Sequence, residues 1–308
     1  MERAAGTEAV IELTAVLVAV TGEEPRILTV EDGKALPSGP FASDHRTLQM
    51  GLRSWVERQT HHPLGYIEQL YTFADRDRRP EGGGGRVISI SYLGLTREGR
   101  ASGEHVPGWQ SWYRYLPWED WRGGKPALVG RVIVPQLGRW AAKAPDGAAR
   151  RARTQRIHAT FGSDSATWNE ELVLQRYELL YEAGLVPESG QRGATALAGE
   201  AMMLDHRRIL ATGIARLRAK IKYRPVVFEL MPPSFTLLQL QRAVEALAGQ
   251  RLHKQNFRRL VDQQGLVEET GGVATATGGR PAKLFRFRRS VVAERAVSGT
   301  KLPLARSP

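Results

Sequence analysis

The 308-residue sequence has no cysteine, which excludes disulfides, thiolate zinc sites and cysteine nucleophiles. It also lacks long apolar runs. The longest, TAVLVAV at residues 14–20, is far shorter than the roughly 20 residues that a membrane-spanning helix needs. The opening residues MERAAGTEAVIEL contain acids and no apolar core, so they do not form a secretory signal. We therefore expect a cytoplasmic protein that has no membrane partner.

Acidic residues are in the minority, and the formal net charge is +12. The excess is uneven, because residues 250–308 hold twelve Lys and Arg against four acids. That segment alone carries a net charge of +8, two-thirds of the total. Such asymmetry is typical of proteins that bind a polyanion. A solvated basic tail is the alternative, since charge alone gives only an electrostatic footprint.

The first 96 residues combine strand and helix patterns. A helix is expected from about Ser43 to Gln59, because Leu48, Leu52 and Trp55 form one apolar stripe, and Ser43 or Asp44 can cap it. Strands separated by turn residues are expected around it. They lie at 9–20, 26–30, 64–75 and 86–95.

The middle of the chain is richest in aromatic residues. Residues 104–122, EHVPGWQSWYRYLPWEDWR, hold four of the seven tryptophans. They could form a stacking platform for a base, but aromatic rings bury large areas wherever they lie, so core packing or a dimer contact is the main alternative. The stretch AAKAPDGAARRARTQR at 141–156 has the composition of an exposed linker or loop. Helices are expected at 169–184 and about 200–221.

The C-terminal region has the order helix, turn, basic helix and two strands. SFTLLQLQRAVEALAG offers Ser234 or Thr236 as a cap and Gly249 as a stop, and LHKQNFRRLVDQQG follows as a second helix ending at Gly265. LVEET and AKLFRFR read as the two strands of a wing. The order is that of a winged helix-turn-helix, in which the second helix enters the major groove.

The second of these helices carries the residues expected to read DNA. We expect Phe257, Leu260 and Val261 to lie inward and the polar residues to face a groove, where Arg and Lys read guanine and Asn and Gln read adenine. The wing residues suit phosphate or minor-groove contacts. A basic helical hairpin packed on another domain is the alternative. The candidates are Lys254, Gln255, Asn256, Arg258 and Arg259 on the helix and Arg280 and Lys283 on the wing.

The stretch GPFASDHRTLQMGLRSWVERQT at 39–60 resembles the Nudix signature G-x5-E-x7-R-E-U-x-E-E-x-G-U, where U is a bulky apolar residue. Gly39, Arg53 and Glu57 match, and Trp55 serves as U. The acids at positions 54, 57 and 58 of the signature share one helical face and would hold Mg²⁺ against substrate phosphates. Here Ser54 and Arg58 replace two of them, and His45 replaces the first Glu. We therefore expect no catalytic residues, no metal and at most vestigial hydrolysis.

Further segments extend this resemblance over nearly the whole chain. QLYTFADRDRRP with RVISISYLGL closely resembles the strand–loop–strand of ADP-ribose-type Nudix proteins. LDHRRIL, RLRAKIKYRP and SFTLLQLQRAVEALAG to GGRPAKLFRF are similar to the Nudix-related transcriptional regulators of NAD metabolism (NrtR-like). VLQRYELLYEAGLVPE, LHKQNFRRLVDQQGLVEETG and the tryptophan insertion resemble their alphaproteobacterial relatives (NadQ-like) more particularly.

The resemblance implies a fold and a function. The fold is an α/β (α+β) Nudix-like effector domain at 1–222, a mixed sheet with flanking helices, followed by a winged helix-turn-helix domain at 223–308. The implied function is repression of NAD-biosynthesis genes by a homodimer on a palindromic double-stranded operator, which would associate the protein with the nucleoid. The resemblance also implies that no cofactor is required and that the effector is ADP-ribose, NAD or ATP.

A diphosphate dinucleotide needs cations for its phosphates and an aromatic or apolar slot for its base. The expected effector residues are Arg53, Glu57, Tyr71, Phe73, Arg76 and Arg86. For Arg53 the alternative is an intrahelical bridge to Glu57 at i+4, and for Tyr71 and Phe73 it is plain core packing. The adjacent His61 and His62 have no third ligand nearby, so a metal site is not expected there.

Two other functions are compatible with the sequence. One is a Nudix pyrophosphatase that cleaves ADP-ribose or NAD(H)-type substrates and carries a nucleic-acid module. The other is a structural nucleoid protein, which would bind DNA without sequence preference and with a steep salt dependence.

Overall fold

The computed structural model describes residues 9–62, 64–74, 86–98, 108–162, 168–190, 199–274, 281–288 and 290. The strands are β1 (Ala9–Thr21), β2 (Glu24–Thr29), β3 (Ser38–Pro40), β4 (Tyr66–Phe73), β5 (Arg86–Leu95), β6 (Gly108–Ser111), β7 (Val267–Ala274) and β8 (Ala282–Phe287). The helices are α1 (Leu48–Thr60), α2 (Val134–Ala142), α3 (Gly147–Phe161), α4 (Val173–Glu182), α5 (His206–Lys220), α6 (Leu237–Ala248) and α7 (Lys254–Gln263).

Strands β1 to β6 form one mixed sheet. The order is β4-β5-β1-β2-β6, with β3 also paired to β1, and β1 runs parallel to β5 but antiparallel to β2. The β1–β2 hairpin turns at Gly22 and Glu23, whose φ angles of 59° and 65° fit a two-residue type I′ turn. The predicted strands and their mixed pairing are thus confirmed.

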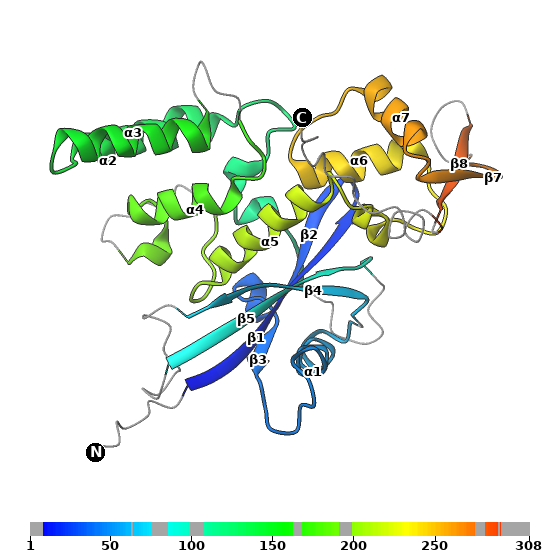
Figure 1. Cartoon of the computed structure of the whole chain (residues 1–308), viewed down its shortest axis with the longest axis horizontal. Coiled ribbons are helices and arrows are strands. Elements are labelled where there is room, and N and C mark those ends of the chain that lie inside the picture. Colours follow the sequence, from blue (N-terminus) through cyan, green and yellow to red (C-terminus); the bar gives the residue numbers. More distant parts are fainter. Residues whose placement is uncertain are drawn as a thin grey trace, which may run out of the picture.

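Helices cover both faces of this sheet, as Figure 1 shows. Leu13 and Leu17 of β1 pack with Leu52 of α1 on one face. Val16 of β1 packs with Ile214 of α5 on the other. Because β1 is buried on both faces, its sequence is almost continuously apolar, and it fixes the places of α1 and α5.

Helix α1 begins later than the sequence indicates. Its cap is Thr47, whose side chain accepts from the backbone N–H of Met50 at 3.1 Å. The expectation that Ser43 or Asp44 caps this helix is therefore wrong. The apolar stripe continues from Leu52 to the buried Val56, a step of four residues.

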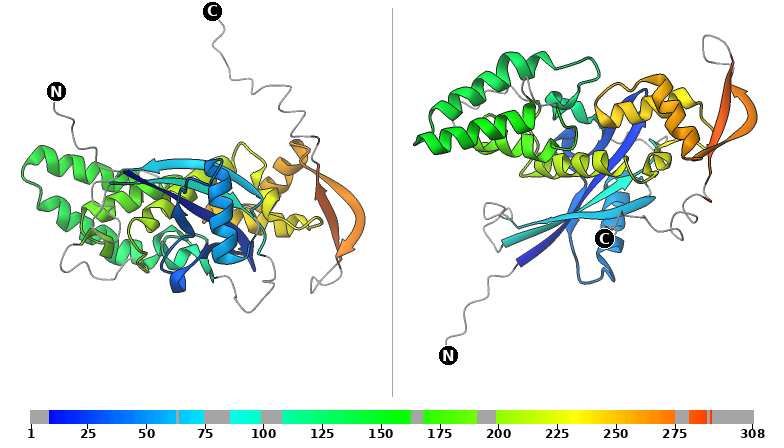
Figure 2. Two further views of the ribbon diagram at one scale, coloured as in Figure 1. Left: turned by 90° about the horizontal axis from the view of Figure 1, so that it is seen from below. Right: turned by 45° about the horizontal axis from the view of Figure 1, so that its top comes forward.

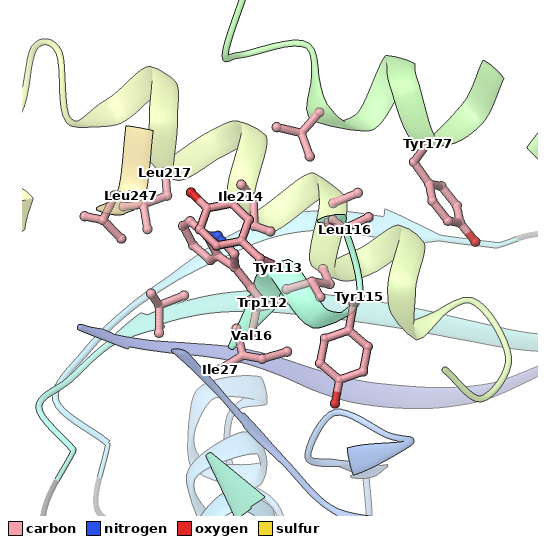
Figure 3. Close-up of a cluster of buried hydrophobic side chains, with 14 of the residues drawn as sticks. Val16, Ile27, Trp112, Tyr113, Tyr115, Leu116, Tyr177, Ile214, Leu217 and Leu247 are labelled. Carbon is pink, nitrogen blue, oxygen red and sulfur yellow. The ribbon is translucent and has the colours of Figure 1, made fainter. Parts of the chain in front are cut away.

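The tryptophan-rich segment lies in the core. Trp112 and Trp118 are fully buried, and Trp109 is 5% exposed. Figure 3 shows this segment entering the space between the sheet and the helical layer, beside Ile214 and Leu217 of α5 and Leu247 of α6. These rings serve packing rather than an open stacking platform.

Residues 141–156 are not a linker. They lie almost entirely in the α2–α3 hairpin, which is helical on both sides of its turn. Asp146 caps α3 by accepting from the Ala149 N–H at 2.7 Å. Ala and Arg are strong helix formers, and Leu137 and Ile157 bury the inner side of the hairpin. The expected exposed loop is therefore wrong.

The C-terminal elements form the predicted winged helix. Thr236 and Gln239 make a capping box at the start of α6, and Gly249 ends that helix with φ 73°. Strands β7 and β8 pair antiparallel as the wing, which lies at the far end of the molecule in Figure 2. Leu260 is 51% exposed, so the expectation that it packs inward with Phe257 and Val261 is wrong: those two join the core and Leu260 does not.

No helix among the described residues is long and apolar enough to span a lipid bilayer.

Candidate functional site

Helix α7 presents its polar side chains to solvent. The five candidate readers on this helix are all exposed, whereas Phe257 is half-buried and Val261 is buried. Within the described part of the chain, no carboxylate pairs with Lys254, Arg258 or Arg259. The helix therefore offers unneutralised donors on its outer side, as base and phosphate contacts require.

The wing is attached to the start of α6 and carries paired charges. Phe235 and Phe285 exchange backbone hydrogen bonds of 2.9 and 2.8 Å. Lys283 contacts Glu269 at 2.8 Å, and both side chains are exposed. An exposed pair of this kind contributes little stability, so Lys283 can exchange its partner for a phosphate. Arg280, the other wing candidate, lies outside the described residues.

An apolar cavity of about 270 Å³ lies between the end of α5 and the two helices of the winged helix. Its lining includes Tyr223, Val244, Phe257 and Leu260. Helix α7 is therefore not fully packed against the end of α5.

The signature stretch is held together by packing. A Cβ at Gly39 would lie 2.2 Å from the Trp55 ring, so only glycine allows β3 to pass beneath this side chain. Trp55 also donates its indole N–H to the Pro40 carbonyl at 2.8 Å. The Arg58 guanidinium lies 4.7 Å from the centre of the Trp55 ring, and it contacts the Ser54 hydroxyl at 3.4 Å. Positions 54 and 58 thus interact with each other and with Trp55.

Arg53 does not form the intrahelical bridge to Glu57 that was its alternative role. Its guanidinium donates to the backbone carbonyls of Leu64 and Gly65, the latter at 3.1 Å, and so fixes the segment between α1 and β4. Glu57 is exposed, and no cation among the described residues pairs with it.

The remaining effector candidates lie in different surroundings. Tyr71 is 59% exposed, whereas Phe73 is 3% exposed and belongs to the core. The two rings meet edge to face with centroids 5.1 Å apart, so Phe73 supports Tyr71 from inside. Arg76 lies outside the described residues, and of Arg86 only the β5 backbone is described.

His61 and His62 are separated by the end of α1. His61 adopts the left-handed conformation that terminates the helix. His62 is buried, which lowers the pKa of its ring, and its Nε2 lies 2.9 Å from the Thr96 hydroxyl. Over the described ranges, no three His, Cys, Asp or Glu side chains gather as a metal site would require.

A buried ion triad joins the tryptophan-rich segment to α4 and α5. Glu119, Arg176 and Arg218 are each fully buried. Arg176 contacts the Glu119 carboxylate at 2.5 and 2.8 Å, and Arg218 contacts it at 2.6 Å. Burial alone would raise the pKa of the Glu119 carboxyl, but the two guanidinium groups outweigh it and hold that pKa below its ordinary value.

The same region holds the end of α6. Tyr113 donates its hydroxyl to the Ala246 carbonyl at 2.7 Å, and Arg218 Nε donates to the Leu247 carbonyl at 2.9 Å. The backbone N–H of Trp121 donates to the Gly249 carbonyl at 2.7 Å. Three carbonyls at the end of α6 and at its cap Gly249, where a helix leaves carbonyls without intrahelical partners, are thus satisfied by the tryptophan-rich segment and α5, which couples both directly to the winged helix.

Sequence reasoning missed this contact, although a signal was present. Arg176 occupies one position of the apolar stripe formed by Val173, Tyr177 and Leu180. Arg218 likewise belongs to the stripe of α5. An arginine at such a position predicts a buried carboxylate partner, because an unpaired buried charge is very costly.

Comparisons with known proteins agree with this architecture. The family model for the NrtR DNA-binding winged helix domain matches residues 227–287. The ADPR responsive transcriptional repressor NtrR of Acinetobacter baylyi is 43% identical over 86 residues, which is 28% of this chain. The match covers 34% of that repressor, so the chain spans about a third of the curated relative.

Two solved structures match almost the whole chain. NrtR of Shewanella oneidensis complexed with a 27mer DNA has a TM-score of 0.52 at 19% identity, covering 92% of this chain and 95% of its own. The NrtR structure from the same organism, in which no DNA is named, has a TM-score of 0.54 at 17% identity, covering 92% and 96%. At these identities the likeness shows the fold. Residues 227–287 thus match the winged helix of NrtR in sequence, and the chain as a whole has the two-part fold of the NrtR structures.

Proposed function

We propose that this chain is a transcriptional repressor of NAD-biosynthesis genes, and that a nucleotide bound in its Nudix-like domain controls its affinity for DNA. The observation that carries the proposal is the NrtR-type winged helix at 227–287, whose helix α7 exposes five polar side chains. A homodimer would place two such helices on half-sites about one helical turn apart. A chromosomal target places the protein in the cytoplasm, at the nucleoid.

The DNA contacts of this proposal are those of α7 and the wing. Arg258→Ala should lower operator affinity by about 1–3 kcal/mol, because it removes a base contact. Arg216→Ala is the matched control, since Arg216 is an exposed cation on α5. Lys283→Ala should weaken binding to all sequences alike and reduce the salt slope by about 1. Equal losses at Arg258 and Arg216 would argue against reading by α7.

ADP-ribose is the first effector to test, because the A. baylyi relative is named as ADPR responsive; NAD and ATP follow. Anisotropy of a labelled duplex from the chain's own upstream region or an NAD-biosynthesis gene, with excess competitor DNA, measures the response. One nucleotide should change the affinity by roughly 5–150-fold. The proposal would be refuted if no sequence-specific complex formed, or if the affinity of that complex were the same with ADP-ribose, NAD and ATP as without them.

We propose that the base of the nucleotide stacks on Tyr71, which Phe73 supports from inside. The phosphates would then lie near Arg76 and Arg86. Arg53 and Glu57 would line the remaining side of the binding site. Loss of a stacked ring costs about 1–3 kcal/mol, so Tyr71→Ala should weaken nucleotide binding in calorimetry by roughly 10-fold. Tyr181→Ala is its control, because Tyr181 is also exposed, at 42%, but on α4. An unchanged nucleotide affinity of the Tyr71→Ala variant would show that the base does not stack on Tyr71.

We further propose that the Nudix-like domain does not hydrolyse its ligand. The support is chemical: Ser54 and Arg58 stand where a Mg²⁺ site needs carboxylates, and both interact with neighbours. Incubation with ADP-ribose and Mg²⁺ should release no AMP above background. Release that disappears in Glu57→Ala would favour the pyrophosphatase instead.

The route from nucleotide to DNA runs through the end of α6. Because the tryptophan-rich segment donates to two carbonyls at that terminus and Arg218 of α5 donates to a third, a shift of the segment together with α5 moves α6 with it. The cavity beside α7 leaves room for such a shift. A nucleotide that binds more tightly to one position of α6 than to another would then change whether the two winged helices of a dimer can occupy both half-sites.

A further inference from the structure

The α2–α3 hairpin, taken with the turn before α2 as residues 129–161, is strongly one-sided in charge. It contains seven Lys and Arg residues and one acid, Asp146. Asp146 is already engaged as the cap of α3. The hairpin therefore carries a large uncompensated positive charge, although it lies outside the winged helix.

The apolar side of the hairpin is used for packing. Ile133, Leu137, Ile157 and Phe161 are at most 4% exposed and belong to the main core. The hairpin is thus fixed to the body of the protein, and its polar side is left to solvent.

Among the described residues, two of the seven cations have a side-chain partner. Arg153 stacks on Trp140 at 4.1 Å and donates to its carbonyl. Arg156 pairs with Glu182 at 2.6 Å. The other five are exposed, and no carboxylate among the described residues contacts them. They are Arg131, Arg139, Lys143, Arg150 and Arg151.

Arg139 and Lys143 lie at the end of α2, where the helix dipole favours positive charge, but two of the other cations do not serve their helix. Arg150 and Arg151 lie near the start of α3, where the helix dipole disfavours positive charge. Neighbouring like charges also repel one another. A polyanion that removes this repulsion is the ligand that fits such a surface.

The hairpin and α7 lie in the same helical layer, on the side of the sheet away from α1, as Figure 1 shows. They are at opposite ends of the long axis, and both views in Figure 2 keep them there. A duplex that meets α7 and extends along this side would bring its flanking phosphates toward the hairpin.

We propose that the α2–α3 hairpin is a second DNA-binding surface, which contacts backbone phosphates outside the half-site read by α7. This inference rests on the proposed function, because it needs DNA held by the winged helix. The contact is electrostatic and independent of sequence, and its strength depends on salt through counterion release.

The experiment compares two duplexes with the full-length protein. One contains the operator alone, and the other adds about 15 base pairs of arbitrary sequence at each end, roughly one and a half turns. The test variant carries Arg139→Gln, Lys143→Gln, Arg150→Gln and Arg151→Gln. The control variant removes three exposed cations elsewhere and carries Lys34→Gln, Arg46→Gln and Arg216→Gln.

The wild type should bind the long duplex ~10-fold more tightly than the short one, with a salt slope steeper by about 2–4, since each phosphate contact contributes about 0.9. The test variant should bind the short duplex like the wild type and lose the gain on the long one. The control variant should keep that gain. Unchanged melting temperatures exclude misfolding.

A test variant that keeps the full gain on the long duplex overturns the inference, as it would if the hairpin served an acidic protein instead. That result leaves the proposed function standing, provided that the wild type still prefers the operator. A wild type without sequence preference on either duplex would instead reject the proposed function.

Discussion

The buried triad makes Glu119→Gln the sharpest test of how this fold is held together. Glutamine keeps the shape of the side chain but removes its charge. Two fully buried guanidinium groups, of Arg176 and Arg218, then share a neutral amide. Burying a charge without its partner is strongly unfavourable, so we expect a large loss of stability from a change of a few atoms.

The magnitude follows from the burial of all three groups. Removing one partner of a buried ion pair costs about 3–5 kcal/mol, a large fraction of the 5–15 kcal/mol by which domains are stable. At about 2–4 °C per kcal/mol for a domain of this size, the melting temperature should fall by roughly 6–20 °C. Because the folded pKa of Glu119 is depressed, the contribution is present above its unfolded pKa of about 4.3. It is lost as the pH falls through the folded value.

Urea unfolding followed by tryptophan fluorescence measures the loss, at pH 7 and at steps down to pH 3. The matched control is Glu182→Gln, which breaks the 2.6 Å pair with Arg156, a pair whose partners are each 47% exposed. That exposed pair should contribute at most about 1 kcal/mol. If Glu119→Gln lost no more than Glu182→Gln, or if its deficit did not shrink in acid, the account of the triad would be wrong.

Three further predictions concern single positions. Gly39→Ala should cost about 1–3 kcal/mol in urea unfolding, because its Cβ would lie 2.2 Å from the Trp55 ring; a neutral effect would mean that the ring moves freely. Tyr113→Phe leaves the Ala246 carbonyl without its 2.7 Å donor and should lower the free energy of unfolding by about 1–3 kcal/mol. Amide hydrogen exchange should become faster at the end of α6 and stay unchanged elsewhere. Burial alone would raise the pKa of Glu245, but hydrogen bonds from its neighbours in the winged helix hold it at about 2. The winged helix should therefore weaken as the pH falls from about 4.3 toward 2, and a Glu245→Gln variant that weakened equally over this range would contradict that.

Strong local patterns made much of the fold predictable. The alternation in β5, the apolar run of β1 and the cap and stop residues of α6 each specify one local structure, and the structure follows them. The order of elements after Pro233 was sufficient to indicate a winged helix, which the family match at 227–287 supports.

The failures came where local signals compete. The cap of α1 was misplaced, because Ser43, Asp44 and Thr47 are all good caps and only the packing of α1 against β1 selects the last. The α2–α3 hairpin was missed because Asp146-Gly147 and a dense run of charge look like a loop. The triad joins residues 57 and 99 positions apart, and nothing local specifies such a pairing.

The docking of α6 also bears on how this protein can be taken apart. A cut near residue 222 would leave the Tyr113 hydroxyl and the Trp121 backbone N–H without acceptors, remove one of the acceptors of Arg218 and uncover the tryptophan-rich surface, so we expect the Nudix-like part not to be an autonomous module. A chimera that grafts this sensor onto a different output domain should retain α6 through Gly249 and change the chain after that glycine. The point at which the two parts can be separated therefore lies one helix after the predicted domain border at residue 222. A new DNA specificity is more easily introduced by replacing α7 and the wing than by replacing everything after residue 222.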